Sequence, residues 1–182
     1  MAEININQEV GKYFKLKHLI YSTAARNNSI NNMPGIDGSP SQSEIINNLK
    51  LLMNNVVDKI IDIPRYSNLV ITSGYRCLEL NKLLGGSNTS QHIYGQAVDI
   101  RIPGLPTREL YNYIYENLSW DQLIWEYPEK EDNSWVHISY GPQNRSKTTL
   151  VSSEDIYHNL YNGERFGSSN QYQHGITDAK IV

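Results

Sequence analysis

The feature that most constrains the fold is a long apolar helix, predicted from residue 41 to about residue 61. Ser41 and Glu44 fit a capping box, in which the two side chains satisfy backbone amides at a helix start. Pro64 makes continuation of the helix unfavourable. We therefore expect a core helix whose buried face is formed by the apolar residues at helical spacing, namely Ile45, Ile46, Leu49, Leu52, Met53, Val56, Val57, Ile60 and Ile61.

Residues 96–102 and 134–140 show the alternation of half-buried strands. In the first segment the apolar residues at 98, 100 and 102 share one face, and Asp99 lies on the other. In the second, the residues at 136, 138 and 140 share a face, and His137 lies opposite. If the apolar faces pack on the helices, Asp99 and His137 both point into a groove on the other side of the sheet.

The remaining patterned segments complete an α+β fold. They predict a small, mainly antiparallel sheet, with helices packed on one face and the groove on the other. The polar stretch 128–134 is expected to be the loop of a hairpin. The other expected elements are strands at 69–72 and 123–127, a short helix at 78–84 and a helix starting at Pro106 and Thr107.

Composition narrows the classes of function. The 182 residues are enough for one domain with a real core. With 16 basic and 19 acidic residues and no dense basic run, a nucleic-acid partner is disfavoured. A single cysteine, Cys77, excludes an intramolecular disulfide and a thiolate-rich metal site. No apolar run reaches membrane-spanning length, and the first residues lack the pattern of a signal peptide.

His92, Asp99 and His137 are candidates for a metal centre, because two histidines and a carboxylate form a known zinc ligand set that leaves one position open for water. The alternative without a metal is that these are surface residues or simple hydrogen-bond partners. A histidine in a strand is also more often structural than a ligand. The residues by themselves leave both interpretations open.

Several motifs occur in a fixed order between residues 73 and 139. They are Ser73-Gly74-Tyr75-Arg76, Asn81, Gly85-Gly86-Ser87, Ser90-Gln91-His92, Gly95, Ala97-Val98-Asp99-Ile100 and Trp135-Val136-His137-Ile138-Ser139. This set resembles the peptidase M15 family, which comprises zinc D-Ala-D-Ala carboxypeptidases and phage L-alanyl-D-glutamate endolysins. The resemblance implies a hedgehog-like or DD-peptidase-like fold, an M15-like zinc peptidase domain over residues 1–150 and a tail of unknown role at 151–182.

The resemblance also implies roles for single residues. His92, Asp99 and His137 would be ligands of Zn²⁺. Arg76 would contact the substrate, either by clamping a carboxylate or by stabilising an oxyanion; the alternative is a surface arginine that caps the next turn. The remaining expected residues orient a ligand or form the walls and scaffold of the site, and they are Ser90, Tyr75, Gln91 and Trp135.

The general base is the point at which this sequence departs from the family. Many members carry an acidic residue three positions before the last histidine ligand, but Ser134 occupies that position here. Glu126 lies on the predicted strand 123–127, across the hairpin from His137, and similar family members have a glutamate there. We therefore predict Glu126 as the base and keep Asp132, in the presumed loop, as the alternative.

The expected activity is zinc-dependent hydrolysis of peptide bonds in peptidoglycan stem peptides, as a carboxypeptidase or an endopeptidase. Without a signal peptide, we expect synthesis in the cytoplasm and action on the cell wall after phage-type release or from a virion. The first alternative is a non-catalytic zinc-binding or wall-binding module on the same scaffold, docked to a virion or tail protein through residues 151–182. The second is a metallohydrolase of the same site that acts on another amide.

Overall fold

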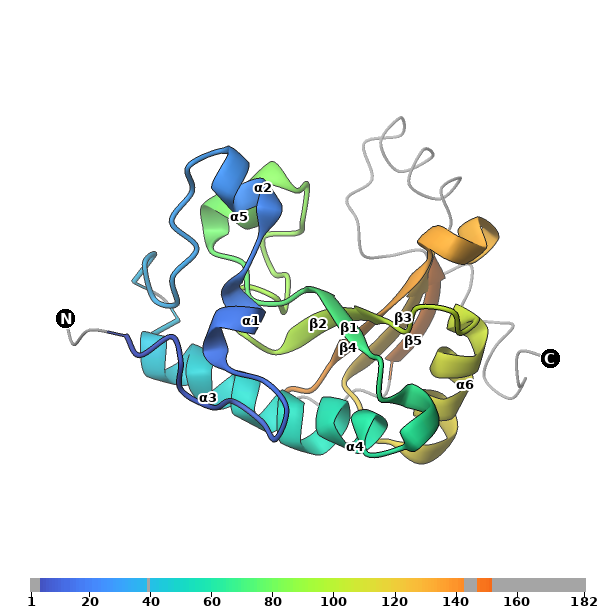
Figure 1. Cartoon of the computed structure of the whole chain (residues 1–182). Helices are drawn as coiled ribbons and strands as arrows, with labels where there is room; N and C mark the ends of the chain where they lie inside the picture. Colours follow the sequence, from blue (N-terminus) through green and yellow to red (C-terminus); the bar gives the residue numbers. More distant parts are fainter. Residues whose placement is uncertain (1–3, 39, 143–146, 152–182) are drawn as a thin grey trace.

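The computed structural model describes residues 4–38, 40–142 and 147–151, without the side chains of 131–132 and 147–151. Its centre is a five-stranded sheet in the order β1-β2-β4-β3-β5 (Figure 1). Only the β3–β5 pair is parallel, and the other pairs are antiparallel. The predicted α+β fold is confirmed. The strands are β1 (Val70–Ser73), β2 (Ala97–Arg101), β3 (Gln122–Glu126), β4 (Trp135–Ser139) and β5 (Lys147–Val151).

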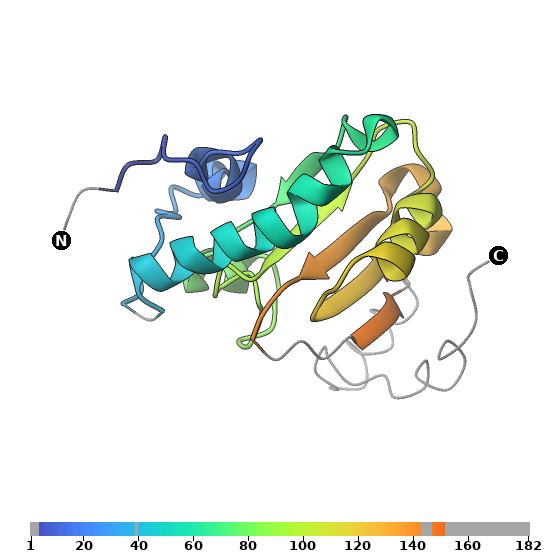
Figure 2. The ribbon, with the colours of Figure 1, turned by 90° about the horizontal axis from the view of Figure 1, so that it is seen from below.

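Helices lie on one face of the sheet and at its side. Seen from below, the long helix formed by α3, η1 and α4, together with α6, lies in front of the strands (Figure 2). The helices α1, α2 and α5 gather beyond the end of the sheet where β2 begins (Figure 1). The bounds are α1 (Leu16–Ile20), α2 (Thr23–Asn27), α3 (Gln42–Leu52), η1 (Met53–Val57), α4 (Asp58–Ile61), η2 (Pro64–Tyr66), α5 (Leu78–Leu83), α6 (Thr107–Asn117) and η3 (Pro128–Asn133).

The long helix begins as predicted, because Ser41 Oγ accepts the backbone N–H of Glu44 at 3.3 Å. Its middle differs from the prediction of a regular α-helix. Residues Met53–Val57 form a π-helical turn between α3 and α4. The wider turn keeps Met53, Val56 and Val57 buried together, so the apolar face continues past the irregularity.

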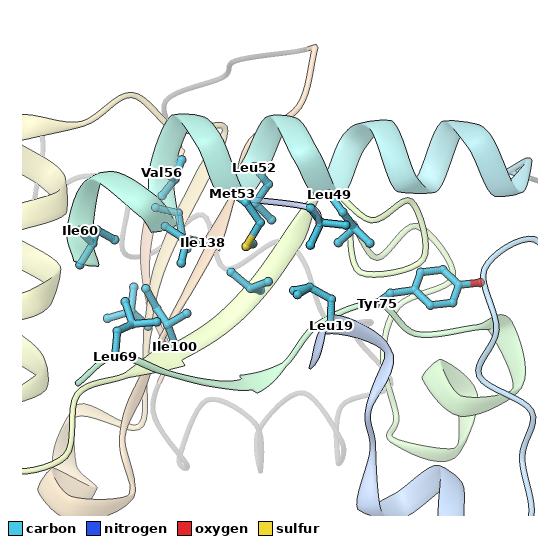
Figure 3. Packing of buried hydrophobic residues seen from close by; sticks show 14 of the residues in the cluster. Leu19, Leu49, Leu52, Met53, Val56, Ile60, Leu69, Tyr75, Ile100 and Ile138 are labelled. Atoms are coloured by element: carbon cyan, nitrogen blue, oxygen red, sulfur yellow. The ribbon is translucent and has the colours of Figure 1, made fainter. Parts of the chain in front are cut away.

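The core lies between this helix and the sheet. Leu49, Leu52 and Met53 extend from the helix towards the strands, where Ile100 and Ile138 meet them (Figure 3). All five side chains are fully buried. Because Ile100 and Ile138 occupy the helix-facing side of β2 and β4, strand alternation places their odd-numbered neighbours on the opposite side. The face on which the predicted groove lies is therefore set by the core.

The strand register aligns the candidate site residues. Asp99 on β2 is directly opposite His137 on β4, and Glu126 on β3 is directly opposite Trp135. The stretch predicted as a hairpin loop contains the 3-10 helix η3. The sequence did not predict β5, which pairs in parallel with β3.

The predicted division into residues 1–150 and a tail at 151–182 stays a prediction, because residues 152–182 lie outside the described part of the chain. Within the described ranges, no helix has both the length and the apolar character needed to cross a membrane.

Candidate metal centre

His92 lies in the loop before β2 and is buried, with 3% of its surface exposed. Its ring Nδ1 is 2.7 Å from the carbonyl oxygen of Gly74. A carbonyl oxygen only accepts hydrogen bonds, so Nδ1 carries the proton and Nε2 points to the site as the ligating atom. Burial, opposed by the nearby Asp99, lowers the pKa of His92. The imidazole is thus held in the neutral form that binds metal ions.

The donor atoms of His92, Asp99 and His137 converge. His92 Nε2 is 3.2 Å from His137 Nδ1 and 3.2 Å from Asp99 Oδ1, and His137 Nδ1 is 2.9 Å from Asp99 Oδ1. Two ligand atoms of a tetrahedral zinc ion lie about 3.3 Å apart, given metal–ligand bonds of about 2.0–2.1 Å. The three atoms therefore fit one face of a zinc coordination tetrahedron. Each of the three residues is buried.

The charge of Asp99 also suits a metal ligand. Burial by itself would raise the pKa of Asp99. The neighbouring His92 and a hydrogen bond from His137 outweigh this effect and hold the pKa well below its usual range. The carboxyl group is consequently ionised at neutral pH. A buried carboxylate beside two imidazoles is a donor set that a divalent cation stabilises.

Arg76 contacts this carboxylate from the other side. Its Nη2 lies 2.6 Å from Asp99 Oδ2, and its Nε donates to Ser73 Oγ at 2.9 Å. The backbone N–H of Arg76 also donates to the carbonyl oxygen of His92 at 3.2 Å. Arg76 therefore links two of the candidate ligands. Its predicted contact with substrate stays a prediction.

Glu126 is the carboxylate on the same face of the sheet as Asp99 and His137. The strand register places it there. Ile124 is directly opposite His137, and Glu126, two residues further along β3, points to the same face as Ile124. Burial and the charge of Asp99 raise the pKa of Glu126 to about 7, against the opposing effects of His137 and Arg76. A carboxyl group that titrates near neutrality is suited to general base catalysis.

Two other acidic or polar candidates can be placed. The backbone of Asp132, the alternative base, lies in η3, but its side chain lies outside the described part of the structure. Ser134 is buried, and its Oγ donates to Thr107 Oγ1 at 2.7 Å. This hydrogen bond ties the start of β4 to α6.

The residues predicted as walls or scaffold occupy different environments. Tyr75 is 3% exposed and belongs to the hydrophobic core, where burial raises the pKa of its hydroxyl (Figure 3). Trp135 packs against Tyr127, with ring centroids 4.8 Å apart. Within the described residues, Ser90 makes hydrogen bonds only through its backbone, to Ser87 and Ile93. The roles predicted for these side chains remain predictions.

Sequence reasoning did not find two of the contacts that hold the site. One is the carbonyl of Gly74, whose position in the Ser-Gly-Tyr-Arg motif was a usable signal. The other involves Asp121, the residue before β3, which is fully buried and accepts a hydrogen bond from Gln91. No local pattern distinguishes Asp121 from a surface residue at a strand start.

Comparison with known families decides the identity of the domain. The sequence model of the peptidase M15 family, described as Peptidase M15, matches residues 12–139. The chain belongs to the peptidase M15 family. No curated protein matches the chain. The match contains every residue of the candidate metal centre, and membership of this family points to a hydrolase that acts on peptides.

Proposed function

We propose that this M15 peptidase is a zinc-dependent hydrolase of peptide bonds in peptidoglycan stem peptides, acting as a carboxypeptidase or an endopeptidase. The single observation that supports it best is the convergence of His92 Nε2, Asp99 Oδ1 and His137 Nδ1 in a buried site. Family membership supplies the class of reaction.

Zinc is the metal that this donor set favours. Two imidazole nitrogens and one carboxylate oxygen match catalytic zinc centres, which keep one coordination position open for a reactant. When bound, zinc would act as a Lewis acid that polarises the scissile carbonyl and makes water more acidic. His92, Asp99 and His137 would hold the ion.

Glu126 would move the protons. A carboxylate whose pKa is about 7 can accept a proton from the attacking water at neutral pH. The same group can then deliver that proton to the amine that leaves when the peptide bond breaks. Its place on β3, across β4 from Asp99, puts it on the same face of the sheet as Asp99 and His137.

Arg76 would contribute by fixing Asp99. Asp99 Oδ2 is 2.6 Å from Arg76 Nη2 in the ion pair. The other oxygen, Oδ1, faces the two histidines and is the atom that could bind the metal. The Arg76 side chain is 15% exposed, and its guanidinium could also bind a substrate carboxylate or a developing oxyanion.

The test is digestion of purified peptidoglycan and of defined muropeptides, followed by mass analysis of the products. Zinc-loaded wild type should release peptide fragments whose masses identify the bond, and Glu126→Gln should cleave at least about 100-fold more slowly while it retains the metal. Protein that binds zinc and releases nothing would favour the non-catalytic module. Cleavage of a different amide would favour the other metallohydrolase.

The cellular setting forms part of the same proposal. We place the enzyme at the bacterial cell wall after phage-type release or as a virion-borne component. The residues that would dock it to a virion or tail protein, 151–182, fall almost wholly outside the described part of the chain. Activity on whole cells added from outside, compared with activity on isolated wall, tests how the enzyme reaches its substrate.

A further inference from the structure

We propose that Gln91 and Asp121 form a buried positioning pair that holds the His92 loop in place for metal binding. This inference deepens the proposed function and rests on it, because it assigns a role to residues that do not touch the metal or the substrate. It starts from one hydrogen bond between Gln91, in the loop before β2, and Asp121, the residue before β3, which are 30 residues apart in the sequence.

The contact is short and buried. Gln91 Nε2 lies 2.5 Å from Asp121 Oδ2, and Asp121 has no exposed surface. The Gln91 amide presents its NH₂ group to the carboxyl oxygen of Asp121, and the same nitrogen lies 3.5 Å from Gln96 Oε1. Gln91 therefore has one favoured orientation.

Asp121 is itself held by the sheet. Its backbone N–H donates to the carbonyl oxygen of Ser139 at 2.8 Å, and the next residue, Gln122, donates its N–H to Ser139 Oγ at 2.8 Å. Ser139 ends β4, two residues after His137. The carboxylate of Asp121 is thus a fixed point attached to the strand that carries another candidate ligand.

Backbone hydrogen bonds connect Gln91 to the rest of the loop that carries His92. The Gln91 carbonyl accepts the backbone N–H groups of Tyr94 at 3.2 Å and Gln96 at 2.9 Å. Gln96 is the residue before β2, and its own carbonyl accepts the N–H of Tyr140 at 2.9 Å. These bonds make residues 91–96 a compact turn whose direction depends on where the Gln91 side chain is bound.

His92 is consequently held from two sides. On one side, the segment from Gly74 to Arg76 binds its ring Nδ1 and its carbonyl oxygen. On the other side, the neighbouring Gln91 is bound to Asp121. A displacement of the loop on the second side would move His92 Nε2 out of the 3.2 Å contacts with Asp99 and His137.

The experiment measures zinc affinity by competition with a chromophoric chelator, together with the absorption spectrum of the cobalt-substituted protein. Gln91→Glu places two carboxylates against each other and should weaken zinc binding by about 10–100-fold and alter the cobalt spectrum. In the double variant Gln91→Glu with Asp121→Asn, the donor and acceptor are exchanged and the hydrogen bond is restored. Most of the affinity and the wild-type spectrum should return.

Three controls make the result decisive. Gln42→Glu, the same substitution on α3, should leave zinc affinity unchanged. Gln91→Met, which removes the donor without adding charge, replaces Gln91→Glu if the latter does not fold. Circular dichroism and the melting temperature of each metal-free protein show whether the fold is intact.

The inference is overturned if folded Gln91→Glu and Gln91→Met bind zinc as tightly as wild type, or if the exchanged pair recovers nothing. The inference is also overturned if the Gln91 variants melt at a lower temperature but keep the zinc affinity of the wild type. The pair would then stabilise the fold without positioning His92. Failure of the proposed function looks different: wild type and variants would bind zinc as expected here, yet no peptide would be cleaved.

Discussion

Arg76 and Asp99 form a partly buried ion pair in which Arg76 Nη2 lies 2.6 Å from Asp99 Oδ2, while Asp99 Oδ1 faces the two histidines. The two oxygens of one carboxylate therefore have separate partners. This division fixes the rotation of the carboxylate plane. It also keeps Oδ1 as the single donor atom that Asp99 offers to a metal ion.

Replacement of Arg76 by alanine should weaken zinc binding by about 10–100-fold, because a partner that orients a ligand typically contributes that much to metal affinity. Arg76→Lys keeps the charge but not the planar fork and should give an intermediate value. Chelator competition measures both. Arg65→Ala, which breaks the exposed Arg65–Glu109 pair instead, is the matched control and should bind zinc normally. Equal affinities for all four proteins would contradict this role of Arg76.

Zinc should stabilise the wild-type protein but not His92→Ala. A ligand present at about 100 times its Kd adds about 2.7 kcal/mol to the free energy of unfolding, provided that it binds only the folded state. Thermal melts with zinc and with a chelator measure the difference. His18→Ala is the control, since His18 is exposed on α1, where its Nδ1 accepts the backbone N–H of Lys15 and its ring contacts Phe14. If zinc raised the melting temperature of His92→Ala as much as that of the wild type, His92 would not be a ligand.

Gly74→Ala should be strongly destabilising, by about 2–4 kcal/mol. A Cβ at this position would collide with the backbone carbonyl of Leu19, so the chain must move, and the Gly74 carbonyl that binds His92 moves with it. Urea unfolding and zinc titration should both show the effect. Gly104→Ala meets open space and should lose only about 1–2 kcal/mol, through its positive φ, with no change in zinc affinity. Similar losses in the two variants would show that the crowding at Gly74 is absorbed elsewhere.

Glu126 should make the stability of the metal-free protein depend on pH. Its folded pKa of about 7 lies above the ordinary glutamate value of 4.5, so the folded state binds more protons between these values. Stability contributed by this group is present at low pH and is lost as the pH rises through 7. The advantage of Glu126→Gln over wild type should therefore grow by about 1–3 kcal/mol between pH 5 and pH 8.

Chemical unfolding of both proteins in the presence of a chelator measures that difference. Because only the difference between the two proteins is used, the titration of groups that do not interact with Glu126 cancels. Parallel stability curves over the whole range would show that the pKa of Glu126 is not raised.

Much of the fold follows from patterns that are local in the sequence. The spacing of apolar residues in the long helix and the alternation around Asp99 and His137 depend on neighbours a few residues away, and the structure confirms both. The alignment of Asp99 with His137 was predictable because the core dictates which face of each strand is buried. The parallel pairing of β5 was not, since the chain leaves β4 and returns on the far side of β3.

The contacts that orient the site lie beyond such patterns. The sequence did not predict that the guanidinium of Arg76 binds Asp99, 23 residues away in the sequence. The Gln91–Asp121 hydrogen bond likewise joins segments that come together only in the folded sheet. Residue type and spacing show which side chains can ligate a metal, but not which neighbours hold them.

The separation of the site residues along the chain has a consequence for synthesis of the protein. His137 is 38 residues from Asp99 and 45 residues from His92, so no short stretch of a nascent chain contains all three. They meet only after β4 has inserted between β2 and β3. A metal centre built in this way cannot form until its last ligand-bearing strand is paired, so metal binding by all three side chains follows the pairing of β4 in the sheet.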